Sequence, residues 1–388
     1  MYNFSKLTNR KETDSLKWDV AKHELPMWVA DMDFETAPEI VEAIEKRVSH
    51  KIFGYNIVPD EYFQSIQYWW QTRHQYNMEK EWMMFCTGVV PAISSIVRKL
   101  TTVGENVLIQ SPVYNIFYNS ILNNGRCVLS SDLVYDGYEY NIDFDDLEKK
   151  AADPKVKLLL LCNPHNPVGR AWTREELKKI ADLCLRYQVT ILSDDVYCGL
   201  TYAGKPYTPI ASLSQEISYH TITFYSTSKT YNTTALRHAF MVSENPELTK
   251  RYSELLTSMG VSYGQNLMGL EATIAAFREC EPWRIRLMEQ IAANHRFLKA
   301  AFEKNMPECK VLQAEATYFA WIDLRALDIR PAQLTYLLEQ ETQIVVENGF
   351  RLGKGGAGFI RFNLATSQEN LQEGTKRLIA FCKRHCKH

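Results

Sequence analysis

Lys229 lies in a short polar stretch that combines an amine with hydroxyl groups. It follows Ser226 and Ser228 in the run Ser226-Thr227-Ser228-Lys229, directly after the apolar run Thr221–Tyr225, and Arg237 comes eight residues later. A lysine amine can condense with an aldehyde to form an imine, while short hydroxyl donors and a fixed positive charge suit a phosphate. Pyridoxal 5′-phosphate needs an imine-forming amine and a phosphate-binding group in one place. The stretch therefore indicates a site for this cofactor; the simpler alternative is a surface lysine in a polar turn.

Three further side chains follow apolar runs and have the chemistry that a pyridine ring requires. Asp194 directly follows the run Thr190–Ser193, and a carboxylate there would keep the ring nitrogen protonated, so that the ring can take up the electrons of a carbanion. Asn166, in the Pro- and Gly-rich turn 163–169, and Tyr197 could both donate to the ring phenolate oxygen. The alternatives are a helix N-cap for the aspartate, turn chemistry for the asparagine and a core position for the tyrosine.

Five other positions could bind the phosphate, the ring or a substrate. Gly88 and Val89 follow an apolar run and are expected to open a helix, whose free N–H groups favour a phosphate. Tyr114 could stack on the ring, and Tyr55 could give a hydroxyl to the phosphate. Arg361 lies in an apolar strand and needs a partner, for which the carboxylate of an amino acid would suit its fork. Core aromatic residues and a structural salt bridge are the alternatives.

Short apolar runs alternate with helical patterns through the middle of the chain. A capping box at Thr173 and Glu176 opens a helix between two of these runs. This alternation predicts an α/β fold with a mostly parallel, doubly wound sheet covered on both faces. Ligands on such sheets bind beyond the carboxyl ends of the strands, where most of the candidate residues fall. The expected strands are Met83–Cys86, Asn106–Gln110, Val156–Cys162, Val189–Ser193, Thr221–Tyr225 and His238–Val242.

The pattern changes beyond about residue 270. A long helical stretch at Leu270–Phe302 leads into Val311–Asp323, a helix near Pro331–Gln340 and a strand ending at Arg361–Asn363. These elements predict a second, smaller α+β domain. We expect a large cofactor-binding domain, a small C-terminal domain and an N-terminal segment that packs with the small domain, at residues 46–270, 271–388 and 1–45 respectively.

Composition and charge exclude several classes of function. The chain is 46% hydrophobic and 23% charged, as in ordinary globular proteins, and its net charge of −2 gives no basis for binding nucleic acid or an anionic membrane. No apolar run approaches the roughly 20 residues that span a bilayer, and the polar N-terminus has no signal-peptide core. Nine scattered cysteines favour reduced thiols and a cytoplasmic location. Cys382, Cys386 and His388 could bind a metal, but a frayed helix end is simpler, and no metal site is predicted.

Together these residues resemble the fold-type I pyridoxal-phosphate enzymes of the class I/II aminotransferase family, and within it the MalY/PatB-type cystathionine β-lyases (C–S lyases). The resemblance covers nearly the whole chain. The strings WVADMDF and GVVPAI are fairly specific to the lyase branch. The matching segments, in the family's order, are Trp28–Phe34, Phe53–Tyr55, Gly88–Ile93, Ser111–Tyr114, Cys162–Pro167, Ser193–Asp194 and Ser228–Thr230.

The resemblance implies a role for each candidate. Lys229 would be the Schiff-base lysine and Asp194 the partner of the pyridine nitrogen, and both would be catalytic together with Tyr197. Tyr197 and Asn166 would donate to the phenolate, and Tyr114 would stack on the ring. The phosphate would be held by Gly88, Val89, Ser226, Ser228 and Arg237. The substrate carboxylate would bind Arg361, beside the backbone of Val29 and Ala30. Tyr55 would reach the cofactor of a neighbouring subunit, which implies a homodimer with shared active sites.

Three positions depart from the lyase pattern. That branch usually reads SDEIH where Ser193–Tyr197 reads SDDVY, and both this tyrosine and Arg237 are typical of aminotransferases; Ala316 stands where glycine is common. Three functions therefore stay open. We expect a C–S β-lyase that cleaves cystathionine or a cysteine S-conjugate to thiol, pyruvate and ammonia through an internal aldimine on Lys229. The alternatives are an aminotransferase of an amino acid and a regulatory protein that keeps the cofactor.

Overall fold

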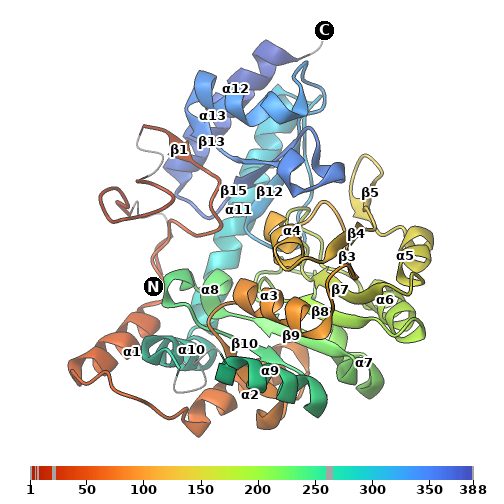
Figure 1. The fold of residues 1–388 in the computed structure, drawn as a ribbon. Helices are drawn as coiled ribbons and strands as arrows, with labels where there is room; N and C mark the ends of the chain where they lie inside the picture. The colour runs from red at the N-terminus through yellow and green to blue at the C-terminus, as the bar shows by residue number, and fades with distance from the viewer. Residues whose placement is uncertain (1, 5, 7, 20–22, 259–264, 387–388) are drawn as a thin grey trace.

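A seven-stranded sheet forms the centre of the larger part of the chain (Figure 1). The structure is a computed structural model that describes residues 1–388 except 1, 5, 7, 20–22, 259–264 and 387–388. The strand order is β2-β10-β9-β8-β7-β3-β4; β10 is antiparallel to both its neighbours and the other pairs are parallel. The bounds are β2 Met83–Cys86, β3 Asn106–Ile109, β4 Cys127–Ser130, β7 Val156–Cys162, β8 Thr190–Asp194, β9 Thr221–Tyr225 and β10 Ala239–Val242.

The predicted fold class and six predicted strands are confirmed, with small differences at strand ends. Strand β3 ends one residue earlier than expected, β8 is displaced by one residue, and β10 begins one residue later. Strand β4 was not predicted. It lies at the edge of the sheet, and none of its four residues is fully buried, so it lacks the apolar pattern that marks the central strands.

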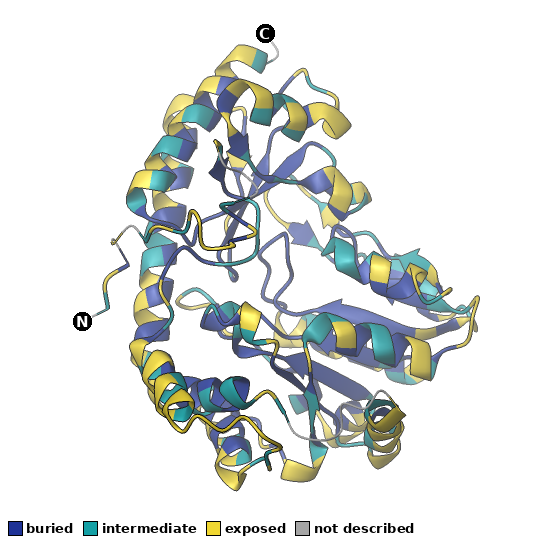
Figure 2. Ribbon diagram, turned by 60° about the vertical axis from the view of Figure 1, so that its left-hand side comes forward, coloured by how far each residue is buried: buried dark blue, intermediate teal, exposed yellow. Residues whose placement is uncertain are grey.

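Helices cover both faces of this sheet, as Figure 2 shows by the buried strands between helices with exposed outer faces. In β7, Leu158 and Leu160 pack on one side, and Leu159 and Leu161 pack on the other. This arrangement explains the continuous apolar run, because both faces of a covered parallel sheet are dry. The first side carries α3 (Val89–Leu100), α4 (Asn115–Leu122) and α9 (Pro246–Ser258); the second carries α5 (Phe144–Ala151), α6 (Arg174–Arg186) and α7 (Gln215–Tyr219). The predicted capping box opens α6.

The long helical stretch predicted at Leu270–Phe302 is confirmed, and the structure divides it into two helices. Helix α10 (Leu267–Glu279) ends before Cys280, and α11 (Glu281–Asn305) begins a new axis. Pro282 stands in the first turn of α11, where its missing N–H costs nothing, whereas the same proline would interrupt a continuous helix. Helix α10 packs against α1 (Pro38–Ser49) and α2 (Asp60–His74), and the short helix α8 spans Thr227–Thr230.

The C-terminal part contains a four-stranded antiparallel sheet in the order β11-β12-β15-β14, with bounds Lys310–Val311, Phe319–Asp323, Phe359–Asn363 and Glu347–Asn348. It packs with α11, α12 (Leu334–Thr342) and α13 (Gln368–His385). Near the N-terminus, β1 (Leu25–Pro26) pairs in parallel with β13 (Ile344–Val345). This pairing supports the expected packing of the N-terminal segment with the C-terminal part. The boundaries at residues 45 and 270 stay a proposal, and they fall within α1 and α10. A separate hairpin joins β5 (Val134–Tyr135) and β6 (Tyr140–Asn141), and short 3-10 turns span 80–82, 210–212, 234–236, 331–333, 349–352 and 354–356.

Among the residues that the structure describes, no helix has the length and apolar character to cross a bilayer. No group of three or more histidine, cysteine, aspartate or glutamate side chains among them is arranged to hold a metal ion, and His388 of the C-terminal motif lies outside the described residues.

Candidate active site

The carboxyl ends of three neighbouring strands meet at one edge of the central sheet. The register places Cys162, Asp194 and Phe224 side by side across β7, β8 and β9. Beyond these ends come Asn166 and, through α8, Lys229. Asn163 N donates to Asp194 O at 3.1 Å, which ties two of the segments together. The sheet therefore gathers the predicted residues where ligands bind on folds of this kind.

The Lys229 amine is half-buried and points at the N-terminal segment. Its Nζ donates to the carbonyl oxygen of Ala30 at 2.7 Å. Burial, and then the positive charge of Arg361, lower the pKa of Lys229 to about 8, against the opposing charges of Asp31 and Asp194. A lysine with a lowered pKa is partly neutral near that pH, and a neutral amine can act as nucleophile and as base.

Asp194 is a buried carboxylate that lacks a cation. It is 6% exposed, its Oδ1 accepts from Val196 N at 3.3 Å, and it makes no ion pair with any residue that the structure describes. Burial raises the pKa of Asp194 to about 7, although the Val196 N–H and the charge of Lys229 oppose the rise. A buried carboxylate without a partner is costly, and a protonated ring nitrogen is a group that would remove this cost.

Arg361 and Asn166 form a buried pair at the same edge. Arg361 Nη1 donates to Asn166 Oδ1 at 3.0 Å, and Nη2 donates to Trp28 O at 3.1 Å. The guanidinium lies 4.1 Å from the Phe319 ring centroid, and its buried Nε has no partner. Glu347 is its cross-strand neighbour, but the closest approach is 4.0 Å. Because Asn166 uses its oxygen for Arg361, its amide N–H groups remain as donors, as a phenolate requires.

Tyr114 and Tyr197 lie among these charges. Burial raises the pKa of Tyr114, while Arg361 lowers it and Asp194 raises it. Burial also raises the pKa of Tyr197, which Arg361, Tyr114 and Asp194 all influence. Both rings therefore share one site with the arginine and the carboxylate. The structure thus brings the predicted ring-stacking residue and the predicted phenol donor together, and their roles stay predictions.

The predicted phosphate residues meet at the junction of β2 and β10. Ala239 pairs with Cys86, so Arg237 and Gly88 lie opposite each other beyond the paired ends. Gly88 is the N-cap of α3, no side chain caps this helix, and Val89 is its first residue. Arg237 is exposed and makes no ion pair with a described residue. A free guanidinium beside an uncapped helix N-terminus is suited to a phosphate.

The two predicted serines differ in what their hydroxyls do. Ser226 Oγ donates to His238 O at 2.7 Å and accepts from Ser228 N at 3.1 Å. Its O–H is thus used within the protein by His238 O, while its oxygen caps α8 by accepting from Ser228 N. The hydroxyl of Ser228 has no partner among the described residues. Sequence reasoning could not separate the two, because both lie in the same polar run.

The segment Trp28–Met32 has five consecutive carbonyl groups, and side chains from distant positions donate to every one. Besides the bonds from Arg361 and Lys229, Tyr318 Oη donates to Ala30 O at 2.9 Å. Asn363 donates to the carbonyls of both Val29 and Asp31. The carbonyl of Met32 accepts from Arg10 and Asn232. Sequence analysis predicted the Val29–Ala30 border but missed Tyr318, Asn232 and Asn363, for which no local pattern gives a signal.

Two acidic side chains of this segment are paired within the protein. Lys17 is fully buried and donates to Asp33 Oδ1 at 3.0 Å, which also accepts from Trp18 Nε1 at 2.8 Å. Arg10 bridges Asp31 at 2.8 Å and Asp33 at 3.1 Å. The N-terminal residues therefore fix the segment from the outside, and the alternating acids of WVADMDF neutralise two cations.

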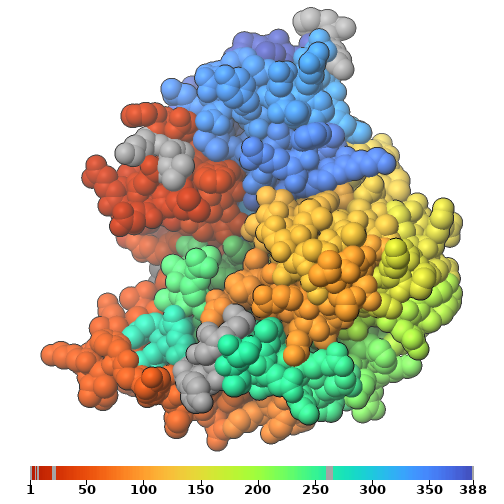
Figure 3. All heavy atoms as spheres, in the orientation of Figure 1, coloured from red at the N-terminus to blue at the C-terminus, as the bar shows by residue number. Residues whose placement is uncertain are grey.

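Tyr55 does not join the rest of the site within this chain. Its side chain is 97% exposed, and Ile52, Phe53 and Ile57 of the same stretch are also exposed. Figure 3 shows the neighbouring orange-red part of the chain protruding at the lower left of the molecule. An extended stretch with four exposed large hydrophobic side chains is unusual unless another surface covers it.

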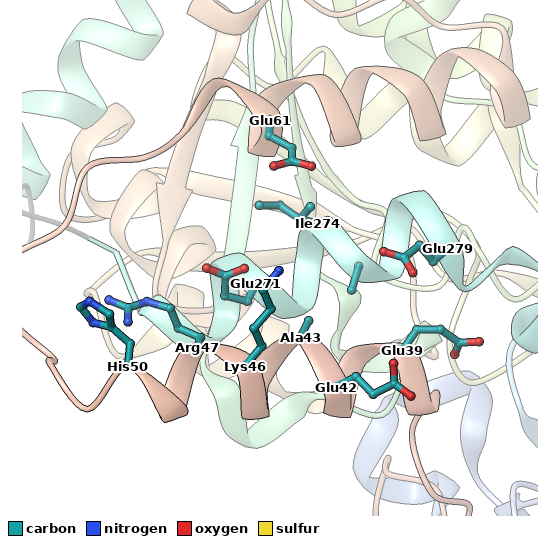
Figure 4. A pocket seen from close by; sticks show the side chains of 11 residues that line it. Glu39, Glu42, Ala43, Lys46, Arg47, His50, Glu61, Glu271, Ile274 and Glu279 are labelled. Carbon is teal, nitrogen blue, oxygen red and sulfur yellow. The ribbon is translucent and has the colours of Figure 1, made fainter.

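A separate surface cavity of about 690 Å³ lies between α1, α2 and α10 (Figure 4). Its lining is mostly charged and includes Glu39, Glu42, Lys46, Glu271 and Glu279. None of the predicted site residues lines it, so it is distinct from the edge of the sheet that carries Lys229.

Comparison with known proteins shows the family of this chain. The chain matches the sequence model of the class I and II aminotransferases over residues 23–378, and it belongs to this family. It is 36% identical over 384 residues to cystathionine beta-lyase PatB of Bacillus subtilis, covering 97% of this chain and 99% of that protein. It is 31% identical over 386 residues to protein MalY of Escherichia coli, covering 98% of each. The predicted family resemblance is confirmed.

A solved structure gives the same result for the fold. Cystalysin from Treponema denticola, whose crystal structure contains pyridoxal 5′-phosphate, matches with a TM-score of 0.96 and 33% sequence identity, covering 99% of each chain. The residues at the edge of the sheet fit such a cofactor on their own chemistry. They supply an amine of lowered pKa, a buried carboxylate without a cation, and free donors for a phosphate.

Proposed function

We propose that this chain is a pyridoxal 5′-phosphate-dependent C–S β-lyase that cleaves cystathionine or a cysteine S-conjugate to a thiol, pyruvate and ammonia. Relatives named cystathionine beta-lyase match almost the whole chain. The observation that carries the proposal is that Lys229 and Asp194 lie at the same edge of the sheet. The amine has a pKa of about 8, and the buried carboxylate makes no ion pair with a described residue.

Bound pyridoxal phosphate supplies an aldehyde that condenses with the Lys229 amine and a cationic ring that takes up electrons from the substrate Cα. The protein's own part is the handling of protons. Lys229 Nζ takes the proton from Cα, which general-base help of this kind accelerates by roughly 10²–10⁴-fold. Asp194 holds a proton at the ring nitrogen, and Asn166 and Tyr197 donate to the phenolate oxygen.

The remaining residues bind and orient. Arg361 holds the substrate carboxylate through its fork and its unpartnered Nε, beside the Val29–Ala30 backbone. Tyr114 stacks on the ring. The phosphate is bound by Ser228, Arg237 and the Gly88–Val89 start of α3, while Ser226 shapes this pocket by capping α8.

We also propose a homodimer in which Tyr55 completes the site of the neighbouring subunit. The exposed side chains of Ile52, Phe53 and Ile57 favour burial against a second copy, and Tyr55 has no described partner within its own chain. A symmetric interface would place each stretch beside the other subunit's site.

A cytoplasmic location is the last part of the proposal. No disulfide joins the cysteines that the structure describes, and most of them are buried in apolar surroundings. Reduced thiols of this kind are typical of a reducing compartment.

Tyr197 and Arg237 favour a second candidate, an aminotransferase, because both positions follow the aminotransferase pattern. One experiment separates the two. Purified protein is incubated with L-cystathionine, and pyruvate and thiol are measured without a 2-oxo acid and then with one. We expect pyruvate in both conditions and none from the Lys229→Ala variant. Turnover that depends strictly on the added 2-oxo acid would refute the lyase.

A further inference from the structure

The oxygen of Ala30 accepts hydrogen bonds from two side chains. Lys229 Nζ donates to it at 2.7 Å and Tyr318 Oη at 2.9 Å. A carbonyl oxygen has two lone pairs, so these two donors use its full capacity. The tyrosine hydroxyl therefore decides how much of this acceptor the lysine can use.

Tyr318 is held rigidly where the two parts of the chain meet. Its side chain is fully buried, and its ring lies 4.7 Å from that of Phe319 and 5.8 Å from that of Tyr197. Leu364 N donates to Tyr318 O at 2.8 Å, and the preceding Thr317 N donates to Leu200 O at 2.8 Å. Tyr318 directly precedes β12 of the C-terminal sheet, and its hydroxyl bonds to the N-terminal segment.

We propose that Tyr318 is a positioning residue for the Lys229 amine: its hydroxyl fixes the Ala30 carbonyl and weakens that oxygen as an acceptor for the lysine. The proposal rests on the function assigned to Lys229 above. A neutral amine needs only one such bond to be oriented, and it keeps its lone pair for a proton. An ammonium depends more on a strong acceptor than a neutral amine does, because hydrogen bonds made by charged groups are the stronger ones. Tyr318 therefore favours the neutral form that acts as a base.

The charged groups that face Lys229 stay in place when the tyrosine hydroxyl is removed. They are Arg361, which lowers its pKa, and Asp31 and Asp194, which raise it. In Tyr318→Phe the ring and these charges remain, and only the hydroxyl is lost. The Ala30 oxygen, without its second donor, should bind the ammonium more strongly and raise the proton affinity of Lys229 severalfold, up to about tenfold or one pH unit, the value of one whole hydrogen bond to a charged group.

The test measures the amine directly. The full-length chain, stripped of cofactor, is treated with trinitrobenzenesulfonate across pH 6 to 11, and the fraction of Lys229 modified is measured by peptide mass spectrometry. We expect the midpoint of Tyr318→Phe to lie above that of the wild-type chain, by up to about one pH unit. The matched control is Tyr202→Phe, which removes a buried hydroxyl that has no hydrogen-bond partner among the described residues, and its midpoint should equal the wild-type value.

An unchanged or lower midpoint in Tyr318→Phe, or an equal rise in Tyr202→Phe, would overturn the proposal. If Tyr318→Phe does not fold, a crystal structure of the wild-type chain without cofactor decides: Lys229 Nζ beyond roughly 3.2 Å from Ala30 O would overturn it. The readout does not depend on turnover. A raised midpoint together with a lack of any imine on Lys229 would refute the proposed function and leave the positioning role intact.

Discussion

The unpartnered carboxylate of Asp194 allows a prediction about stability as well as activity. Asp194→Asn keeps the shape of the side chain and the acceptor for Val196 N, but removes the charge. Burial raises the pKa of Asp194 from 3.8 to about 7. At about 1.4 kcal/mol per pH unit, this rise of about three units means that the ionised carboxylate costs the fold about 4 kcal/mol.

The sign follows from the direction of the change in pKa. An acid whose folded pKa lies above its unfolded value binds more protons in the folded state, so it destabilises the fold at high pH. The penalty is complete above about pH 7 and disappears below about pH 4. A buried neutral amide costs about 1–2 kcal/mol itself. We therefore expect Asp194→Asn, stripped of cofactor, to be more stable than the wild-type chain by about 2–3 kcal/mol at pH 8 and by less at pH 5.

Urea denaturation at the two pH values measures this difference. Asp182→Asn is the control, because Asp182 is exposed in an i,i+4 pair with Lys178, and a surface pair of this kind contributes under about 1 kcal/mol. With cofactor bound, Asp194→Asn should lose roughly 10²-fold or more in pyruvate release, since the charge that matches the ring cation is gone. If Asp194→Asn is less stable than the wild-type chain at pH 8, or if its stability changes equally at both pH values, the unpaired Asp194 carboxylate does not destabilise the fold and this reasoning is refuted.

Three further predictions concern the lysine, the arginine and the exposed tyrosine. Lys229→Ala should lose the imine absorbance near roughly 420 nm, whereas Lys178→Ala should keep it; unchanged absorbance would remove Lys229 from the mechanism. Arg361→Lys replaces a fork with a point charge and loses one charge-assisted hydrogen bond, so KM should rise by roughly 10- to 100-fold, and an unaltered KM would contradict its role. Tyr55→Ala and Lys229→Ala should each be inactive alone, but refolding an equal mixture should restore about a quarter of wild-type activity, because half of the dimers carry one complete site. No recovery would argue against shared sites.

Much of the large part of the fold could be predicted because its signals are local. The strand β7 is marked by a run of leucines, and the box at Thr173 marks the start of α6. The site residues Asp194 and Lys229 could be found because each follows a recognisable strand, and parallel strands bring their carboxyl ends together. The break at Cys280 was missed because apolar spacing continues across it, and only the proline marks a new helix.

The rest depends on contacts between distant parts of the chain. Tyr318 has the sequence context of a core aromatic, and its bond to Ala30 joins residues 288 positions apart. The burial of Lys17 beside Asp33 could not be predicted from the sequence either, since an isolated lysine in a polar N-terminus is ordinarily exposed. The difference between the hydroxyls of Ser226 and Ser228 follows from the position of His238, directly before β10, which periodicity does not reveal.

The bonded carbonyls of Trp28–Met32 limit how the two sheets can move. Lys229 and Asn232 reach this stretch from the central sheet, whereas Tyr318, Arg361 and Asn363 reach it from the C-terminal sheet. Any tilt of one sheet relative to the other must break bonds on at least one side. Opening of the molecule for substrate entry would then be linked to release of the lysine. Because the acceptors are backbone carbonyls, substitutions within the stretch would leave these acceptors in place, whereas substitutions of the remote donors would remove the bonds.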